Sequence, residues 1–217
     1  MRPIVYVETN WLIAYLFPHE RRHRGAKELL DCAERNDCDL RVPLISFIEA
    51  HGTMSRVGTS FSDELERVRE KLKNVYDAGW AGFNGEQFML SVTNDAYFTR
   101  NLVDLLEKLK NNQAVTHFSH PTDEVSEIGK LGLDLRLYTS DMKDLYILAA
   151  ILVDLRKIRQ QEPDRPALFL SSNEKEFSPK KSKVTQAFYE HNKLLYWSEF
   201  KDLQTSIGKW YSLFPQP

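Results

Sequence analysis

Cysteine is scarce in this chain of 217 residues: Cys32 and Cys38 are the only two. Both fall in one predicted helix-to-loop stretch. A pair of this kind excludes a disulfide framework, and too few thiols are present for a thiolate zinc site. A reducing cytoplasm is therefore the simplest setting for the protein.

Long apolar runs are also missing from the sequence. The first residues, Met1–Val7, form a short strand-like run with no long apolar segment behind it. No later stretch is long and apolar enough to span a bilayer. We therefore expect a soluble, unsecreted protein that makes no membrane contact.

Neither sign of charge is in large excess. The 29 Lys and Arg residues against 31 Asp and Glu give a formal net charge of -2. This balance excludes a protein coated in positive charge, so any contact with a nucleic acid has to come from local basic clusters.

Three basic clusters are present, and each is more often a solvated surface run than a nucleic-acid contact: Arg21–Arg24, Arg156–Arg159 and Lys180–Lys183. The third has the best claim. Its Lys180, Lys181 and Lys183 closely follow the polar segment at Asn173, so they are predicted to touch phosphates beside it.

What the sequence does contain is a core large enough for one domain over residues 1–217, with 42% hydrophobic positions. Short apolar runs typical of buried strands alternate with amphipathic segments typical of helices. Such alternation implies an α/β fold: a parallel sheet with right-handed crossovers and helices on both faces. The predicted strands are Ile4–Val7, Leu40–Pro43, Ala114–Phe118, Ala167–Leu170 and Leu194–Trp197.

The predicted helices differ in strength. Ser140–Ile158 is the clearest, because its centre, Leu145–Val153, is apolar on every face and so predicts a buried helix. Approximately residues 58–112 are amphipathic and charged without a strand signal, and we interpret them as a helical insertion or cap. The other predicted helices are Trp11–Leu16, Ala26–Ala33, the stretch from Ile45 to Glu49, Val184–His191 and Phe200–Leu213.

Acidic and amide side chains recur where predicted strands end. Glu8 follows the first strand, Glu49 lies in the helix after the second, Asp141 and Asp144 lie in the first turn of the buried helix, and Asn173 follows a later strand. Functional groups of open α/β sheets gather beyond the carboxyl ends of the strands. Carboxylates that converge without counter-charges repel one another, and a hard divalent cation is the usual resolution.

Each of these residues also has an ordinary structural explanation. Glu8 alone could be a solvated strand-end acid, Asp141 is fully explained as a helix cap, and Asn173 is more often a turn residue than a ligand. Glu49 and Asp144 are harder to dismiss, because both adjoin apolar sequence where an unpaired charge is costly. Only the combination points to a metal site.

These residues resemble the PIN-domain family, which includes the VapC-type toxin ribonucleases. The resemblance lies in four blocks that occur in family order and span almost the whole chain: Val7–Asn10, Ser46–Glu49, Asp144–Ala149 and Ser171–Phe177. It implies a three-layer α/β/α PIN-like domain with a central parallel sheet. It further implies a Mg²⁺- or Mn²⁺-dependent endoribonuclease that hydrolyses RNA phosphodiester bonds.

By this resemblance, Glu8, Glu49 and Asp144 are the acidic metal ligands, and Asn10 and Ser171 orient them or a metal-bound water. The resemblance also implies Asn173 or Glu176 as the fourth polar group. We choose Asp144 over Asp141 as ligand, because Asp144 leads directly into the apolar run.

The chain departs from the family pattern at two positions. The first family carboxylate is usually Asp and here is Glu8, and the fourth acidic position is Asn173. These departures favour one tightly held ion over two. They are also the evidence for the alternative that the protein is a catalytically inactive PIN-like scaffold that binds RNA or protein.

Other activities and several partners stay open at this point. A metal phosphatase or a DNA flap nuclease uses similar acids. As a ribonuclease, the protein would serve as a toxin, a stress-response nuclease or a defence effector. Its expected partners are then the RNA substrate, an antitoxin or defence-system protein, and a second copy in a homodimer.

Overall fold

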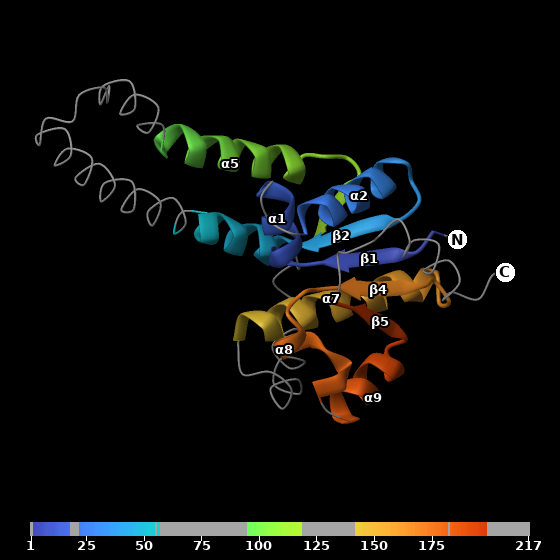
Figure 1. The fold of residues 1–217 in the computed structure, drawn as a ribbon. Coiled ribbons are helices and arrows are strands. Elements are labelled where there is room, and N and C mark those ends of the chain that lie inside the picture. Colours follow the sequence, from blue (N-terminus) through green and yellow to red (C-terminus); the bar gives the residue numbers. More distant parts are fainter. Residues whose placement is uncertain are drawn as a thin grey trace, which may run out of the picture.

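The computed structural model describes residues 2–17, 22–54, 56, 95–118, 142–181 and 183–198 (Figure 1). These ranges contain one sheet built from β1 (Ile4–Val7), β2 (Asp39–Pro43), β3 (Val115–Phe118), β4 (Ala167–Leu170) and β5 (Leu194–Trp197). The strand order is β3-β2-β1-β4-β5, and every neighbouring pair is parallel. The predicted α/β class, with its parallel sheet and its five strands, is confirmed.

The central position of β1 explains its composition. All four of its residues are buried, and the same is true of β4 beside it. Residues that point to either face of these strands meet a helical layer, so both faces need apolar side chains. A run of consecutive apolar residues is the sequence signature of this arrangement.

The helices connect the strands. They are α1 (Thr9–Leu16), α2 (His23–Glu34), a helix over residues 44–54, α5 (Asp95–Lys110), α7 (Met142–Gln161), α8 (Glu174–Phe177) and α9 (Lys183–His191), with a short 3-10 helix η1 (Pro179–Lys181). The predicted helix Phe200–Leu213 and residues 58–94 of the predicted insertion lie outside the described residues. No helix within the described ranges is both long and apolar enough to cross a membrane.

Helices lie on both faces of the sheet (Figure 1). Each face carries one hydrophobic cluster. On one face, Val5 and Val7 of β1 pack with residues of α1, α2 and the helix over 44–54. On the other face, Ile4 and Tyr6 of the same strand pack with α7. Leu106 of α5 is buried in the first cluster, so the end of the predicted insertion contributes to the core.

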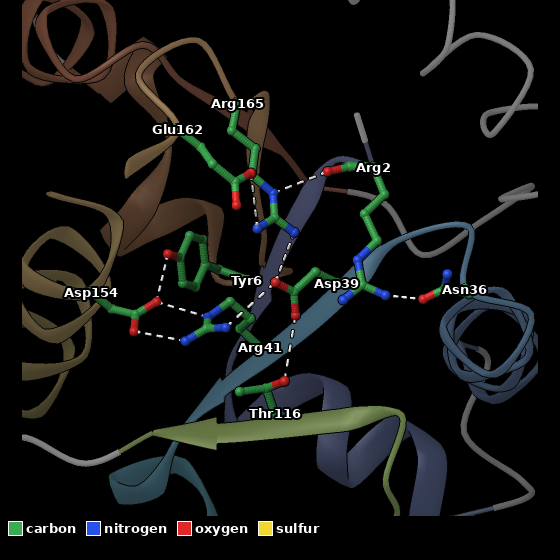
Figure 2. Close-up of polar contacts among 9 residues, drawn as sticks. All are labelled: Arg2, Tyr6, Asn36, Asp39, Arg41, Thr116, Asp154, Glu162 and Arg165. Carbon is green, nitrogen blue, oxygen red and sulfur yellow. Dashed lines mark hydrogen bonds and ion pairs between the residues drawn. The ribbon is translucent and has the colours of Figure 1, made fainter. Parts of the chain in front are cut away.

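A buried polar network joins α7 to the sheet (Figure 2). Asp154 of α7 accepts a hydrogen bond of 2.7 Å from the hydroxyl of Tyr6 on β1. It also accepts two from Arg41 on β2, 2.8 Å from Nε and 2.9 Å from Nη2. This two-pronged pairing is the strongest geometry open to an arginine and a carboxylate. One side chain of α7 thus holds two adjacent strands.

The same network continues toward the amino ends of the strands (Figure 2). Asp39, the first residue of β2, accepts hydrogen bonds from Arg165 Nη2 at 2.9 Å, from Arg41 Nη1 at 3.4 Å and from the Thr116 hydroxyl at 3.4 Å. Arg165 precedes β4 and also donates to the carbonyl of Arg2 at 3.1 Å. One set of ion pairs and hydrogen bonds therefore joins β1, β2 and β3 to α7 and to the segment before β4.

Candidate functional site

The candidate site lies at the carboxyl ends of β1, β2 and β4. Val7 pairs with Leu170 in the register of β1 and β4, so the next residues, Glu8 and Ser171, leave the sheet side by side. The helix over 44–54 follows β2 and brings Glu49 to the same edge. Parallel strands thus gather residues that are far apart in the sequence, as the strand-exit rule predicts.

Glu8 is held in place by two neutral donors. It caps the start of α1, where the backbone N–H of Asn10 donates to its Oε2 at 2.9 Å. The Ser171 hydroxyl donates to Oε1, also at 2.9 Å. The Glu8 side chain is only 4% exposed, and among the described residues no basic side chain contacts it. A buried carboxylate in such surroundings carries an uncompensated charge.

The surroundings of Glu8 raise its pKa from the ordinary 4.5 to about 7. Burial is the largest cause, because it penalises the charged form. The hydrogen bonds from Asn10 and Ser171 lower the pKa, whereas the negative charges of Asp144 and Glu49 raise it. The negative charges of Asp144 and Glu49 therefore both act on Glu8.

Glu49 lies between α1 and the start of α7. The Thr9 hydroxyl donates to its Oε2 at 2.5 Å, and Lys143 Nζ lies 3.9 Å from its Oε1. Thr9 is the neighbour of Glu8 in the sequence, and Lys143 is the neighbour of Asp144. Through these two contacts, Glu49 is linked to the segments that carry the other two acids.

Asp144 and Asn173 are paired in the structure. Asn173 Nδ2 donates to Asp144 Oδ2 at 3.4 Å, and the backbone N–H of Asn173 donates to the Ser171 hydroxyl oxygen at 3.0 Å. Ser171 in turn donates to Glu8. A chain of hydrogen bonds therefore runs from Glu8 through Ser171 and Asn173 to Asp144.

The structure brings together most of the residues that the sequence singled out: Glu8, Glu49, Asp144, Ser171 and Asn173. Asn10 takes part through its backbone N–H. Glu176 is buried in α8, with its Oε1 3.9 Å from Lys175 Nζ. Asp141 lies outside the described residues.

The lysines predicted to bind nucleic acid follow α8. Lys180 in η1 and Lys183 in α9 are exposed, and the side chain of Lys181 lies outside the described part of the structure. A phosphate contact requires an exposed side chain, and Lys180 and Lys183 meet this requirement. No other observation tests whether Lys180, Lys181 and Lys183 bind a nucleic acid, so this assignment stays a prediction.

Sequence reasoning missed several residues that contact the site. Thr9 and Lys143 both contact Glu49, and Tyr196 donates through its hydroxyl to the carbonyl of Ser171 at 2.8 Å. Arg22 donates from Nη1 to the hydroxyl of Ser172. Thr9 and Lys143 each adjoin a chosen acid, and that adjacency was the available signal. For Tyr196 and Arg22 the sequence offered none, because only the fold brings them near.

The donor types suit a hard cation, although the described residues form no ready-made ligand set. Within the described ranges, no group of three or more His, Cys, Asp or Glu side chains is arranged to hold a metal ion. The oxygen atoms of Glu8, Glu49 and Asp144 are nevertheless the ligand type that Mg²⁺ and Mn²⁺ prefer. A cation beside Glu8 would also compensate its buried charge.

No protein-family model, curated protein sequence or solved structure matches this chain. The fold and the geometry of the site are therefore the observations on which a function has to be argued.

Proposed function

We propose that this chain is a PIN-like, metal-dependent nuclease of three-layer α/β/α architecture that hydrolyses RNA phosphodiester bonds. One observation carries the proposal. Glu8 is buried at the carboxyl edge of a parallel sheet without a basic partner among the described residues, and the charges of Asp144 and Glu49 act on it. Repulsion within such a group of acids lowers the stability of the protein unless a cation binds there. Acids with strongly perturbed pKa values of this kind cluster at functional sites.

In this proposal Glu8, Glu49 and Asp144 hold one Mg²⁺ or Mn²⁺ ion. When bound, the ion would lower the pKa of a water molecule and offset negative charge on the phosphate. Ser171 keeps Glu8 oriented, and the Asn173 amide does the same for Asp144. Because these hydrogen bonds fix the acids before substrate arrives, the site is partly preorganised.

Cleavage of structured RNA tests the proposal. The wild-type protein is incubated with Mg²⁺, Mn²⁺ or a chelator, beside Asp144→Asn and the control Asp164→Asn. Asp164 is a matched acid whose side chain is 91% exposed and pairs with Lys193, far from the strand exits. We expect metal-dependent cleavage by wild type and Asp164→Asn only. A wild type that stays inert with both metals would refute the enzymatic proposal.

One observation favours a second candidate, an inactive scaffold that binds RNA or protein. Both Glu8 oxygens already have hydrogen-bond partners, and no described trio of acids forms a finished metal site. For a scaffold, the same assay gives no cleavage with any metal while RNA binding persists.

The cellular role proposed with the nuclease is that of an intracellular toxin or defence effector. Induced expression of the wild type should then arrest growth, and expression of Asp144→Asn should not. Equal growth with both proteins would argue against this role while leaving the biochemical proposal intact.

A further inference from the structure

Arg22 lies at the edge of the site, although no assigned role includes it. Its Nη1 donates a hydrogen bond to the hydroxyl of Ser172. We propose that Arg22 is a phosphate-binding residue of this site, whose guanidinium contacts a backbone phosphate of single-stranded RNA. This inference rests on the proposed function for its choice of RNA, but not for the position of Arg22.

The hydrogen bond to Ser172 ties the guanidinium to the chain segment that carries two site residues. Ser172 stands between Ser171, whose side chain bonds Glu8, and Asn173, whose side chain bonds Asp144. Arg22 is therefore bonded to the residue that joins those two site contacts along the chain. A phosphate held there would sit at the rim of the carboxylates.

RNA that approaches this negatively charged site needs a positively charged side chain nearby. Glu8, Glu49 and Asp144 together repel an approaching polyanion, and the chain as a whole carries a formal net charge of -2. The Ser172 hydroxyl is neutral, and its hydrogen bond orients the guanidinium at this segment. Arginine suits this task because its planar fork matches two phosphate oxygens.

The backbone at Arg22 is fixed before any ligand arrives. Its carbonyl accepts from the Ala26 N–H at 3.0 Å as α2 begins. The next residue, His23, bonds through Nδ1 to the Ala14 carbonyl at 3.0 Å, and its ring centroid lies 6.3 Å from that of Tyr15. The start of α2 is thereby anchored on α1, the helix that Glu8 caps. Less conformational freedom is lost when such an arginine binds.

Fluorescence anisotropy with a labelled single-stranded RNA tests the inference, with a chelator present so that no cleavage occurs. Arg22→Gln is compared with Arg24→Gln, which removes the same charge two positions away. Arg24 is a suitable control because its side chain is 82% exposed and pairs with Glu28 at 2.9 Å. Arg22→Lys keeps the charge but loses the fork, and melting curves verify that each variant is folded.

We expect Arg22→Gln to weaken binding about tenfold and to reduce the salt dependence by roughly one phosphate contact. Arg24→Gln should bind within about twofold of wild type, and Arg22→Lys should fall between the two Gln variants. The inference is wrong if Arg22→Gln and Arg24→Gln weaken binding equally, if neither does, or if the wild type binds no RNA. If RNA binding depends on Arg22 but the wild type cleaves no RNA with either metal, the nuclease proposal is wrong and the inference about Arg22 stands.

Discussion

At the scale of one residue, burial of the charged Glu8 carboxylate lowers the stability of the protein, although the same carboxylate is a proposed metal ligand. Its pKa of about 7 means that burying its charge is unfavourable in the metal-free protein. In the unfolded chain the same side chain would ionise near 4.5, so the folded state holds an extra proton between these two pH values. The contribution of Glu8 to stability is fully present below pH 4.5 and is lost as the pH rises to about 7.

Glu8→Gln should therefore stabilise the metal-free protein at high pH. Glutamine keeps an oxygen to accept from the Asn10 N–H, and its NH₂ group can donate to the Ser171 oxygen. Relative to wild type, the free energy of unfolding of the variant should rise on the order of 3 kcal/mol between pH 4.5 and 8. Urea denaturation in chelator at several pH values measures this difference, and a difference that does not change with pH would contradict the account of Glu8.

Activity should respond to Glu8 in the opposite direction. Glu8→Gln removes a charged ligand and should abolish metal-dependent cleavage. Glu8→Asp should also impair cleavage, because the shorter side chain holds the carboxylate too far from the ion. A misplacement of about 1 Å can lower the rate on the order of a hundredfold. Initial rates on one RNA under one condition decide this. A gain with Glu8→Asp would instead mark the wild type as an impaired enzyme.

At the scale of one element, Asp144 lies in the first turn of α7, and the sequence offers Asp141 as the competing acid. Asp144 is coupled to Glu8 and bonded to Asn173. Asp144→Asn should therefore abolish cleavage. Asp141→Asn, which the sequence marks as a cap, should cost about 1 kcal/mol of stability and leave cleavage in place. Paired rate and denaturation measurements test both variants, and the reverse ranking of the two rates would refute the assignment.

The middle of α7 depends on Asp154, which is 7% exposed and bonds both Tyr6 and Arg41. Asp154→Ala leaves a partly buried guanidinium without its main partner, so it should cost about 3–5 kcal/mol. Tyr6→Phe loses one hydrogen bond to the same carboxylate and should cost about 1–3 kcal/mol.

Urea denaturation of these two variants is compared with Asp164→Ala, which removes one partner of the exposed Lys193–Asp164 pair and should cost less than about 1 kcal/mol. If Asp154→Ala were no more damaging than Asp164→Ala, the network would not hold α7 to the sheet.

At the scale of the whole molecule, the features that could be predicted from the sequence were those that depend on residues close together in the chain. A buried parallel strand is apolar at every position, and Ala167–Leu170 therefore predicted β4 with its observed bounds. The rule that functional groups follow strand ends then placed Glu8, Glu49 and Asn173 at one edge.

What could not be predicted depends on partners far apart in the chain. Arg41 and Asp154 are 113 positions apart, and no local pattern in the sequence pairs them. The amphipathic pattern of α5 showed that one face is buried but not what covers it. Arg22 reaches Ser172 across 150 positions, and no local pattern encodes such a contact.

Anomalous diffraction from crystals soaked in Mn²⁺ tests the central claim most directly. The soak should be above pH 7, because Glu8 is ionised there. The account predicts one manganese peak at roughly 2.0–2.6 Å from carboxylate oxygens of Glu8, Glu49 and Asp144, with Glu49 turned away from Thr9 or Lys143 to reach it. A peak distant from all three carboxylates, or no peak at saturating Mn²⁺, would contradict it.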